Sequence, residues 1–222
     1  MRLIGTANHG YSPYAIEELR RLMGGGSFTQ LAAGEVFLVE TTLDKQQLAG
    51  LIAANPPIFL RHIQPVDEVL ELEGNESDLA SLTKAVQNLA GSLAGRKAAV
   101  HVRKSAKTSY PYSPADSRTI VDEILTAAGA EIVRQQPDNI IAIYAADSRM
   151  YIGVGTPEEM LSDWPGGAIR FQKEEGQISR AKFKLLEAER VFGLDLSAYR
   201  SALDIGAAPG AGLRCCWNGD FM

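Results

Sequence analysis

The apolar positions of the first seventy residues change period repeatedly, which predicts short strands alternating with amphipathic helices. The expected strands cover residues 3–7, 28–31, 35–41 and 58–63. The first helix is expected at 12–22, because Pro13 suits the first helical position and a run of three glycines follows the helix. The second helix begins after an N-cap, either Thr42 or Asp44, and ends before Asn55. The order is therefore strand, helix, strand, strand, helix, strand.

That order is the split βαβ or ferredoxin-like arrangement, a frequent fold that hosts many functions. After Pro65 a second pattern starts, whose elements are expected as a helix at 78–93, a strand at 98–103, a polar loop at 104–113, a helix at 114–128 and strands at 131–134, 139–145 and 150–154. In the first of these strands, Val100 and Val102 face one side while His101 and Arg103 face the other. The strand at 139–145 is apolar almost throughout, so we expect it at the centre of a sheet.

Charge is distributed unevenly along an acidic chain. The 222 residues carry 22 Lys and Arg against 27 Asp and Glu, a net charge of −5. Between residues 96 and 118, six basic residues accompany a single acidic one. The six are Arg96, Lys97, Arg103, Lys104, Lys107 and Arg118. A solvated surface run would explain this basic island, and so would a phosphate-binding face, because a local positive field attracts a polyanion even to an acidic protein.

The second unit resembles a THUMP domain. The likeness is carried by a helix, a V-H-V-R-K strand at 100–104, the basic loop, a long helix, and a hairpin that closes in G-V-G-T-P at 153–157. THUMP domains occur fused to RNA-modifying enzymes, often behind a ferredoxin-like unit, and are implicated in RNA binding. The resemblance implies RNA binding, and we expect the six basic residues to contact RNA phosphates. Aromatic residues are sparse in this unit, but Tyr110 and Tyr112 lie in the basic loop and are candidates for stacking on bases.

The C-terminal segment carries two further motifs. S-R-A-K-F-K-L at 179–185 reads as the start of a helix with Ser179 as its N-cap. L-D-I-G-A-A-P-G at 203–210 reads as a buried strand, 202–205, that breaks into a glycine-containing turn. Glycine lets backbone amides approach a ligand closely, and the turn lacks the G-x-G-x-x-G spacing of dinucleotide sites. An ordinary strand-to-helix turn and a solvated lysine at position 184 are the alternatives without a ligand.

Together these two motifs resemble the opening of FtsJ-like, S-adenosylmethionine-dependent RNA 2'-O-ribose methyltransferases, and with the THUMP resemblance they point to the bacterial large-subunit ribosomal RNA type. The likeness implies that Lys184 is the first member of a Lys-Asp-Lys-Glu catalytic set. It also implies that the turn cradles the methionine part of the cofactor through Asp204, Gly206, Ala207, Ala208, Pro209 and Gly210. A lysine there helps the ribose hydroxyl lose its proton or stabilises the developing alkoxide.

The sequence departs from this family after Gly210. The family continues with Gly-Trp-Ser/Thr, whereas this chain has A-G-L-R-C-C-W-N-G-D-F-M at 211–222. The acidic residue that would hold the cofactor's ribose, and the other three catalytic positions, are not among these residues. We therefore expect a truncated or frame-shifted methyltransferase domain, and a chain that neither binds the cofactor nor transfers a methyl group by itself.

Several other functions are excluded or disfavoured by composition. No apolar run reaches the roughly 18 to 20 residues of a membrane span, and no signal peptide begins the chain, so a cytoplasmic location is expected. The two cysteines, Cys215 and Cys216, are adjacent, and no Cys/His spacing suits a metal. His9, His62 and His101 are isolated in sequence, so structural roles are expected for them. Glu158 and Glu159 are interpreted as the start of a helix capped by Thr156 instead of an acid/base pair.

The predicted fold class is α+β: a ferredoxin-like unit at 1–66, a THUMP domain at 67–165, and a linker with the first helix and strand of a Rossmann-like methyltransferase domain at 166–222. The expected partner is structured RNA, in particular ribosomal RNA, and the cofactor of the full-length family is S-adenosylmethionine. Two alternatives stay open at this point. One is a stand-alone RNA-binding module without chemistry, and the other is a ferredoxin-like sensor of a small molecule.

Overall fold

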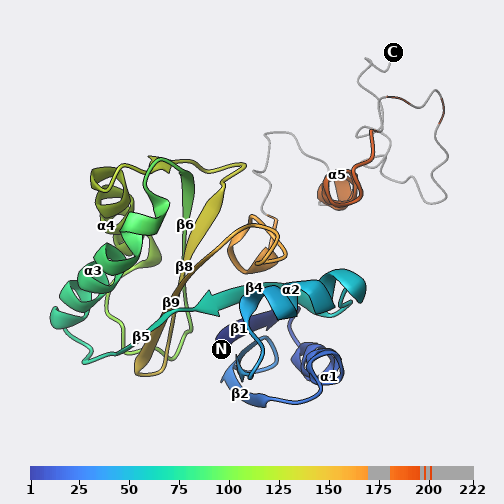
Figure 1. The fold of residues 1–222 in the computed structure, drawn as a ribbon, viewed down its shortest axis with the longest axis horizontal. Coiled ribbons are helices and arrows are strands. Elements are labelled where there is room, and N and C mark those ends of the chain that lie inside the picture. The colour runs from blue at the N-terminus through green and yellow to red at the C-terminus, as the bar shows by residue number, and fades with distance from the viewer. Residues whose placement is uncertain (170–180, 196–197, 199–200, 202–222) are drawn as a thin grey trace. The chain divides into compact units, whose positions relative to one another are not determined.

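The computed structural model describes residues 1–169, 181–195, 198 and 201. The chain divides into two units, residues 1–168 and residues 169–222, and each is described by itself. The first unit is a mixed α+β structure with two sheets, as the sequence predicts (Figure 1). From the second unit the structure describes one helix, α5 (Ala181–Phe192), with the few residues that follow it.

A four-stranded antiparallel sheet forms the N-terminal part of the first unit, with the strand order β2-β3-β1-β4. Its elements are β1 (Arg2–Ala7), α1 (Ser12–Met23), β2 (Ser27–Ala32), β3 (Val36–Glu40), α2 (Lys45–Ala54) and β4 (Leu60–Val66). The two helices bury their apolar faces on one side of the sheet, where Leu19 and Leu48 pack against Phe37 and Ile63. All six elements predicted for this region are confirmed.

Glycine and capping residues mark the ends of the helices that cover the N-terminal sheet. Helix α1 ends at Gly24, whose φ of +70° is a conformation that glycine adopts without strain. Helix α2 begins at Asp44, not Thr42: the Asp44 carboxylate accepts from the Gln47 amide at 2.8 Å, and the Gln47 side chain accepts from the Asp44 amide at 3.0 Å. Strand β4 starts two residues later than predicted, because the amides of Ile58 and Phe59 donate to the Glu18 carboxylate.

A five-stranded mixed sheet follows, with the strand order β5-β9-β8-β6-β7. Its strands are β5 (Glu68–Glu71), β6 (Lys97–Lys104), β7 (Glu131–Ile132), β8 (Asn139–Ala146) and β9 (Arg149–Gly155). Strand β6 is parallel to β7 and β8, whereas β9 is antiparallel to β8 and β5. The edge strand β5 was not predicted, since its four residues show no alternation of polar and apolar positions. Strand β7 is shorter than predicted, because the chain leaves the sheet after Ile132.

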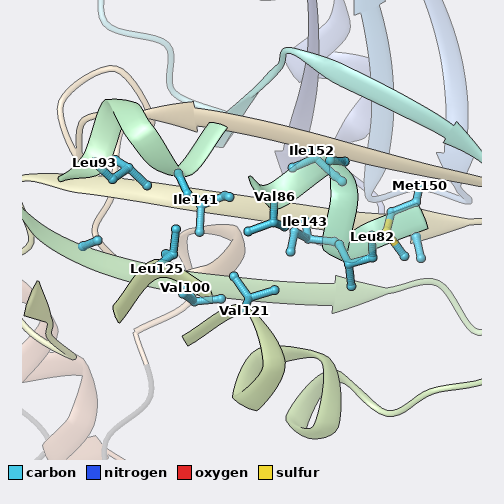
Figure 2. Packing of buried hydrophobic residues seen from close by; sticks show 14 of the residues in the cluster. Leu82, Val86, Leu93, Val100, Val121, Leu125, Ile141, Ile143, Met150 and Ile152 are labelled. Atoms are coloured by element: carbon cyan, nitrogen blue, oxygen red, sulfur yellow. The ribbon is translucent and has the colours of Figure 1, made fainter. Parts of the chain in front are cut away.

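The helices α3 (Ser77–Ala90) and α4 (Pro114–Ala127) cover one face of this sheet, and the short 3-10 helix η1 (Gly91–Leu93) follows α3 (Figure 1). Figure 2 shows the core between them, in which side chains of both helices interdigitate with those of β6, β8 and β9. Its members include Leu82, Val86, Val100, Val121, Leu125, Ile141, Ile143, Met150 and Ile152. This burial of apolar area is the main stabilising contribution to the sheet.

The two sheets pack face to face on their remaining sides. Ile4 and Val36 of the first sheet form one buried cluster with Tyr144, Ala146 and Tyr151 of the second. Strand β8 is thus buried on both faces, which explains its continuous apolar run and confirms its predicted central position.

The segment after β9 differs from the prediction, because the helix expected after Thr156 does not form. Thr156 and Glu159 do exchange the two hydrogen bonds of a capping box, at 2.9 and 3.2 Å. The predicted helix does not continue, however, because residues 157–161 form only a turn, which Leu161 closes with a φ of +62°. A 3-10 turn, η2 (Pro165–Gly167), then completes the unit. The predicted Ser179 cap and the predicted strand at 202–205 lie outside the described residues.

Candidate RNA-binding surface

Strand β6 divides the predicted basic island into two groups. Arg96 and Lys97 lie at its beginning, and Arg103 and Lys104 lie at its end. At a rise of about 3.3 Å per residue, the two ends of the strand are about 23 Å apart. The six residues predicted to contact RNA phosphates therefore do not form a single patch.

The group at the start of β6 is exposed and stands beside polar partners. Arg96 donates to the Asn139 side chain at 3.1 Å, and the backbone amide of Lys97 donates to the Asp138 carboxylate at 2.9 Å. Asp138 thus reduces the positive charge at this end of the strand.

The group beyond the end of β6 comprises Lys104, Lys107 and Arg118, which we call the basic loop group. Lys104 is exposed, and its ammonium donates to the backbone oxygens of Tyr110 and Tyr112 at 3.4 and 3.0 Å, which holds the loop in a closed turn. Lys107 is exposed in the loop. Arg118 lies near the beginning of α4 and is half-buried, with Asp122 at 3.6 Å. Asp122 therefore offsets the charge of Arg118, and Asp116 in the first turn of α4 is a second carboxylate of this region.

Arg103 occupies a different position from its neighbours in sequence. Both terminal nitrogens of its guanidinium donate to the Thr6 hydroxyl at 3.2 Å, and the guanidinium lies over the Tyr144 ring at 5.1 Å from the centroid. Burial lowers the pKa of Arg103 to about 10, so the side chain stays charged at neutral pH. The sequence correctly predicts that Arg103 and His101 share one face of β6, but that face is covered by the first sheet. The predicted contact of Arg103 with an RNA phosphate stays a prediction.

Two buried histidines stand beside this arginine. Burial, together with the positive charges of Arg103 and Arg118, lowers the pKa of His101 to about 4. Burial also lowers the pKa of His62 well below its ordinary value, with Arg103 and His101 contributing. Within the described part of the chain, neither ring nitrogen of His62 has a hydrogen-bond partner, and Nδ1 of His101 has none. Both imidazoles are therefore neutral at pH 7 and belong to the junction of the two sheets.

The two tyrosines of the basic loop do not present open ring faces. Tyr110 is only 3% exposed, and its hydroxyl makes a 2.8 Å hydrogen bond with the Ser117 hydroxyl. Burial raises the pKa of Tyr110. Its ring lies 5.6 Å from that of Tyr112, which is half-buried. These contacts indicate a structural role, and the predicted stacking of bases on Tyr110 and Tyr112 has no support from their positions.

Arg61 is a cation that the charge count along the sequence does not single out, since it lies in an acidic segment. In the structure it is half-buried at the beginning of β4 and donates to the Asn8 side chain and, at 3.1 Å, to the Gly166 backbone oxygen. The ion pairs of the described residues do not include Arg61 or Arg103. Only the fold brings Arg61, from β4, near Arg103, from β6.

The residues predicted to catalyse methyl transfer and to bind the cofactor lie in the second unit. Lys184 is in the first half of α5 and is exposed. The six predicted cofactor-binding positions, 204 and 206–210, lie outside the described residues. Among the residues that the structure does describe, no cluster of three or more His, Cys, Asp and Glu side chains could hold a metal ion. No described helix is long and apolar enough to cross a membrane.

Searches of the sequence against protein families and curated proteins find no match. Solved structures do match. TrmN from Thermus thermophilus has a TM-score of 0.54 at 20% identity over 69% of this chain and 45% of that chain. A predicted N6-adenine-specific DNA methylase from Listeria monocytogenes str. 4b F2365 has a TM-score of 0.47 at 16% identity, over 68% and 39%. A 4-thiouridine synthetase in complex with RNA and ATP has a TM-score of 0.43 at 11% identity, over 69% and 40%.

The comparison with TrmN establishes a shared fold. The likeness extends over most of this chain, whereas the chain spans less than half the length of TrmN. At 20% identity the likeness concerns the fold, and the function has to be argued from this chain's own residues.

Proposed function

We propose that this chain is the RNA-binding part of an S-adenosylmethionine-dependent RNA 2'-O-ribose methyltransferase that acts on ribosomal RNA. In this proposal, residues 1–66 are a ferredoxin-like unit, residues 67–165 are a THUMP domain, and residues 166–222 are a linker and the beginning of a methyltransferase domain. The β2-β3-β1-β4 antiparallel order with two helices on one face supports the first assignment. The V-H-V-R-K strand, with the basic loop after it, supports the second.

The observation that carries the RNA-binding proposal is the basic loop group. Lys104, Lys107 and Arg118 lie around the end of β6 and the beginning of α4, and Asp122 pairs with Arg118 alone. Cations of this kind bind phosphates by releasing condensed counterions from the nucleic acid, without reading its sequence. We therefore propose structured RNA as the partner, bound with weak sequence preference.

The proposal for methyl transfer rests on the sequence motifs. Bound S-adenosylmethionine would supply an activated methyl group, held by the turn at Asp204 and 206–210. Lys184 would orient the ribose hydroxyl and assist the loss of its proton or stabilise the resulting alkoxide. The exposed position of Lys184 on α5 leaves it open to such a substrate.

A matched pair of lysine variants tests the RNA-binding proposal. Lys107→Ala removes an exposed cation of the basic loop group, and Lys84→Ala removes an exposed lysine of α3. We expect Lys107→Ala to weaken binding to a structured ribosomal RNA fragment and to reduce the slope of log K against log salt by about 0.9, which is one phosphate contact. Fluorescence anisotropy at several salt concentrations measures both quantities.

The double variant Lys104→Ala/Lys107→Ala should reduce the slope by about 1.8. Because Lys104 also donates to the backbone oxygens of Tyr110 and Tyr112, thermal unfolding checks that this variant keeps the fold. Arg103 is left in place, because its substitution would also disturb the contact with Thr6. Lys84→Ala should bind like the unmodified chain. Equal effects of Lys107→Ala and Lys84→Ala, or no RNA binding by the unmodified chain, would contradict the proposal and favour a small-molecule sensor.

A further inference from the structure

An exposed aromatic patch lies on the N-terminal unit and has no role in the surface described above. It consists of Tyr11, Tyr14, Ile58 and Phe59, contributed by the start of α1 and the segment before β4. Tyr11 is 48% exposed, Tyr14 57% and Ile58 84%. Most large apolar side chains of the described chain are buried, so three exposed ones beside the half-buried Phe59 indicate a binding function.

The rings of the patch are arranged around Phe59. Tyr11 and Phe59 are stacked, with centroids 5.7 Å apart and planes at 13°. The centroid of Tyr14 is 5.1 Å from that of Phe59 and 6.0 Å from that of Tyr11. Since both tyrosines are about half exposed, the cluster offers ring surface to a flat partner.

Hydrogen bonds to backbone amides fix this arrangement before any partner binds. The Glu18 carboxylate accepts from the amides of Ile58 and Phe59, both at 2.9 Å. The Tyr11 amide donates to the Asn8 backbone oxygen at 2.9 Å. A pre-arranged surface loses little conformational entropy when it binds, which favours affinity.

Arg61 lies between the aromatic patch and the junction of the two sheets, where Arg103 is also located. It follows Phe59 by two residues, and its guanidinium donates to the side chain of Asn8, the residue that also anchors Tyr11. Its Nε is buried and has no partner among the described residues, and no carboxylate of that part of the chain pairs with it. A half-buried cation without a counterion is complementary to an anion.

We propose that the aromatic patch and Arg61 form a binding surface for unpaired RNA nucleotides. The bases stack on Tyr11 and Tyr14, and a backbone phosphate pairs with Arg61. Open rings beside an uncompensated arginine match the two parts of a single-stranded nucleic acid, a flat base and an anionic phosphate. The inference rests on the proposed RNA-binding function and adds to the phosphate-binding basic loop group a site that holds bases.

Variants of Tyr14 test the stacking. Tyr14→Leu keeps apolar surface and removes the ring, whereas Tyr14→Phe keeps the ring. We expect Tyr14→Leu to weaken binding of a single-stranded RNA octamer of alternating adenine and cytosine by about 5-fold to 100-fold, the range for one stacked base. Tyr14→Phe should bind within about twofold of the unmodified chain, and both variants should bind a blunt RNA duplex normally. Anisotropy titrations measure the affinities, and thermal unfolding confirms that each variant is folded.

Two further measurements distinguish stacking from a general loss of structure. In NMR spectra, the ring protons of Tyr11 and Tyr14 should shift upfield when the octamer binds, because a base stacked above a ring shields them. Arg61→Gln should reduce the salt slope for the octamer by about 0.7, the value for one phosphate of a single strand. Phe192→Leu, which changes an exposed aromatic residue of α5, should change neither quantity.

The outcomes separate this inference from the proposed function. Normal binding of the octamer by Tyr14→Leu, with the duplex still bound, overturns the inference and leaves the RNA-binding function standing. A Tyr14→Phe variant as weak as Tyr14→Leu overturns the stacking, because the hydroxyl would then be the contact. Concentration-dependent self-association that Tyr14→Leu abolishes assigns the patch to a second copy of the chain instead. Failure of the unmodified chain to bind either RNA contradicts the proposed function itself.

Discussion

Single residues at the junction of the two sheets set a pH limit on this fold. His62 and His101 are buried, and burial together with Arg103 lowers the pKa of each imidazole below the ordinary value of 6.5. Above pH 6.5 both rings are neutral in the folded and the unfolded chain, so they do not make stability depend on pH. Below pH 6.5 the unfolded chain binds protons that the folded chain resists, and the folded state loses stability as the pH falls. For His101 this loss continues to the folded pKa of about 4.

We therefore expect the free energy of unfolding to decrease between pH 6.5 and 5 by up to about 1.4 kcal/mol per pH unit for each buried histidine. Urea denaturation at pH 7.5, 6.5, 5.5 and 5.0 measures this slope. His101→Gln should reduce the slope by the share of one histidine, whereas His9→Gln, at an exposed position, should leave it unchanged. A free energy of unfolding that stays constant from pH 6.5 to 5 would show that these imidazoles are not excluded from protons.

At the scale of elements, the packing of the two sheets depends on a close crossing of β4 over β9. A Cβ atom at Gly153 would lie 1.9 Å from the backbone oxygen of Pro65 and 2.5 Å from its carbonyl carbon. Because both obstacles are backbone atoms, no side-chain rotation can relieve the clash. Gln64 reinforces the crossing, since its amide nitrogen donates to the backbone oxygens of Ala142 and Tyr151, both at 3.1 Å.

We expect Gly153→Ala to destabilise the protein by about 3 kcal/mol or more. The change is measured as a lower midpoint of urea or heat denaturation. Gly50→Ala is the matched control. Gly50 lies inside α2 with nothing within 4 Å of an added Cβ, so this substitution should stabilise the protein by about 0.5 to 1 kcal/mol. Similar stabilities of Gly153→Ala and the unmodified chain would mean that β4 and β9 do not approach as closely as described.

At the scale of the whole molecule, the residues proposed for RNA binding and those proposed for chemistry belong to different units. The first unit contains two sheets and both helix layers, whereas Lys184 and the proposed cofactor turn belong to the second. Methyl transfer requires cofactor and ribose to be held in contact, and a misplacement of about 1 Å costs on the order of a hundredfold in rate. For this task the proposal assigns to the 222 residues one cofactor turn and one candidate lysine.

Calorimetric titration of the 222-residue chain with S-adenosylmethionine should therefore give no saturable heat, while the same preparation binds structured RNA. The reason is that the proposed turn would contribute only a few backbone donors, too few to hold the cofactor alone. Titration of cofactor into buffer gives the baseline. Saturable binding in the micromolar range would contradict the prediction, and Gly206→Val should then abolish that binding if the turn at 206–210 is the site.

The sequence by itself determined most of the elements of the first unit and the faces that they bury. Apolar periodicity indicated the helices and strands of the first unit other than β5, although the helix expected after Thr156 does not form. The glycine run after Met23 indicated the end of α1, the start of α2 was narrowed to Thr42 or Asp44, and the unbroken apolar run of β8 indicated its central place. These are local consequences of backbone geometry and of side-chain alternation, so a single chain segment contains the information. The exposure of Lys104 and Lys107 was predictable for the same reason, because the charged side chains of a polar surface loop are exposed to solvent.

Only the tertiary structure decided what covers the second face of each sheet. The alternation in β6 placed His101 and Arg103 on one side, but the contact of that side with Thr6 and Tyr144 depends on segments about a hundred and about forty residues away. The burial of Tyr110 and the exposure of Tyr14 were likewise decided by packing, since each is a single tyrosine whose own segment does not show which way it will face. The packing of one sheet against the other is a long-range property, because it sums weak contacts between segments that no local pattern connects.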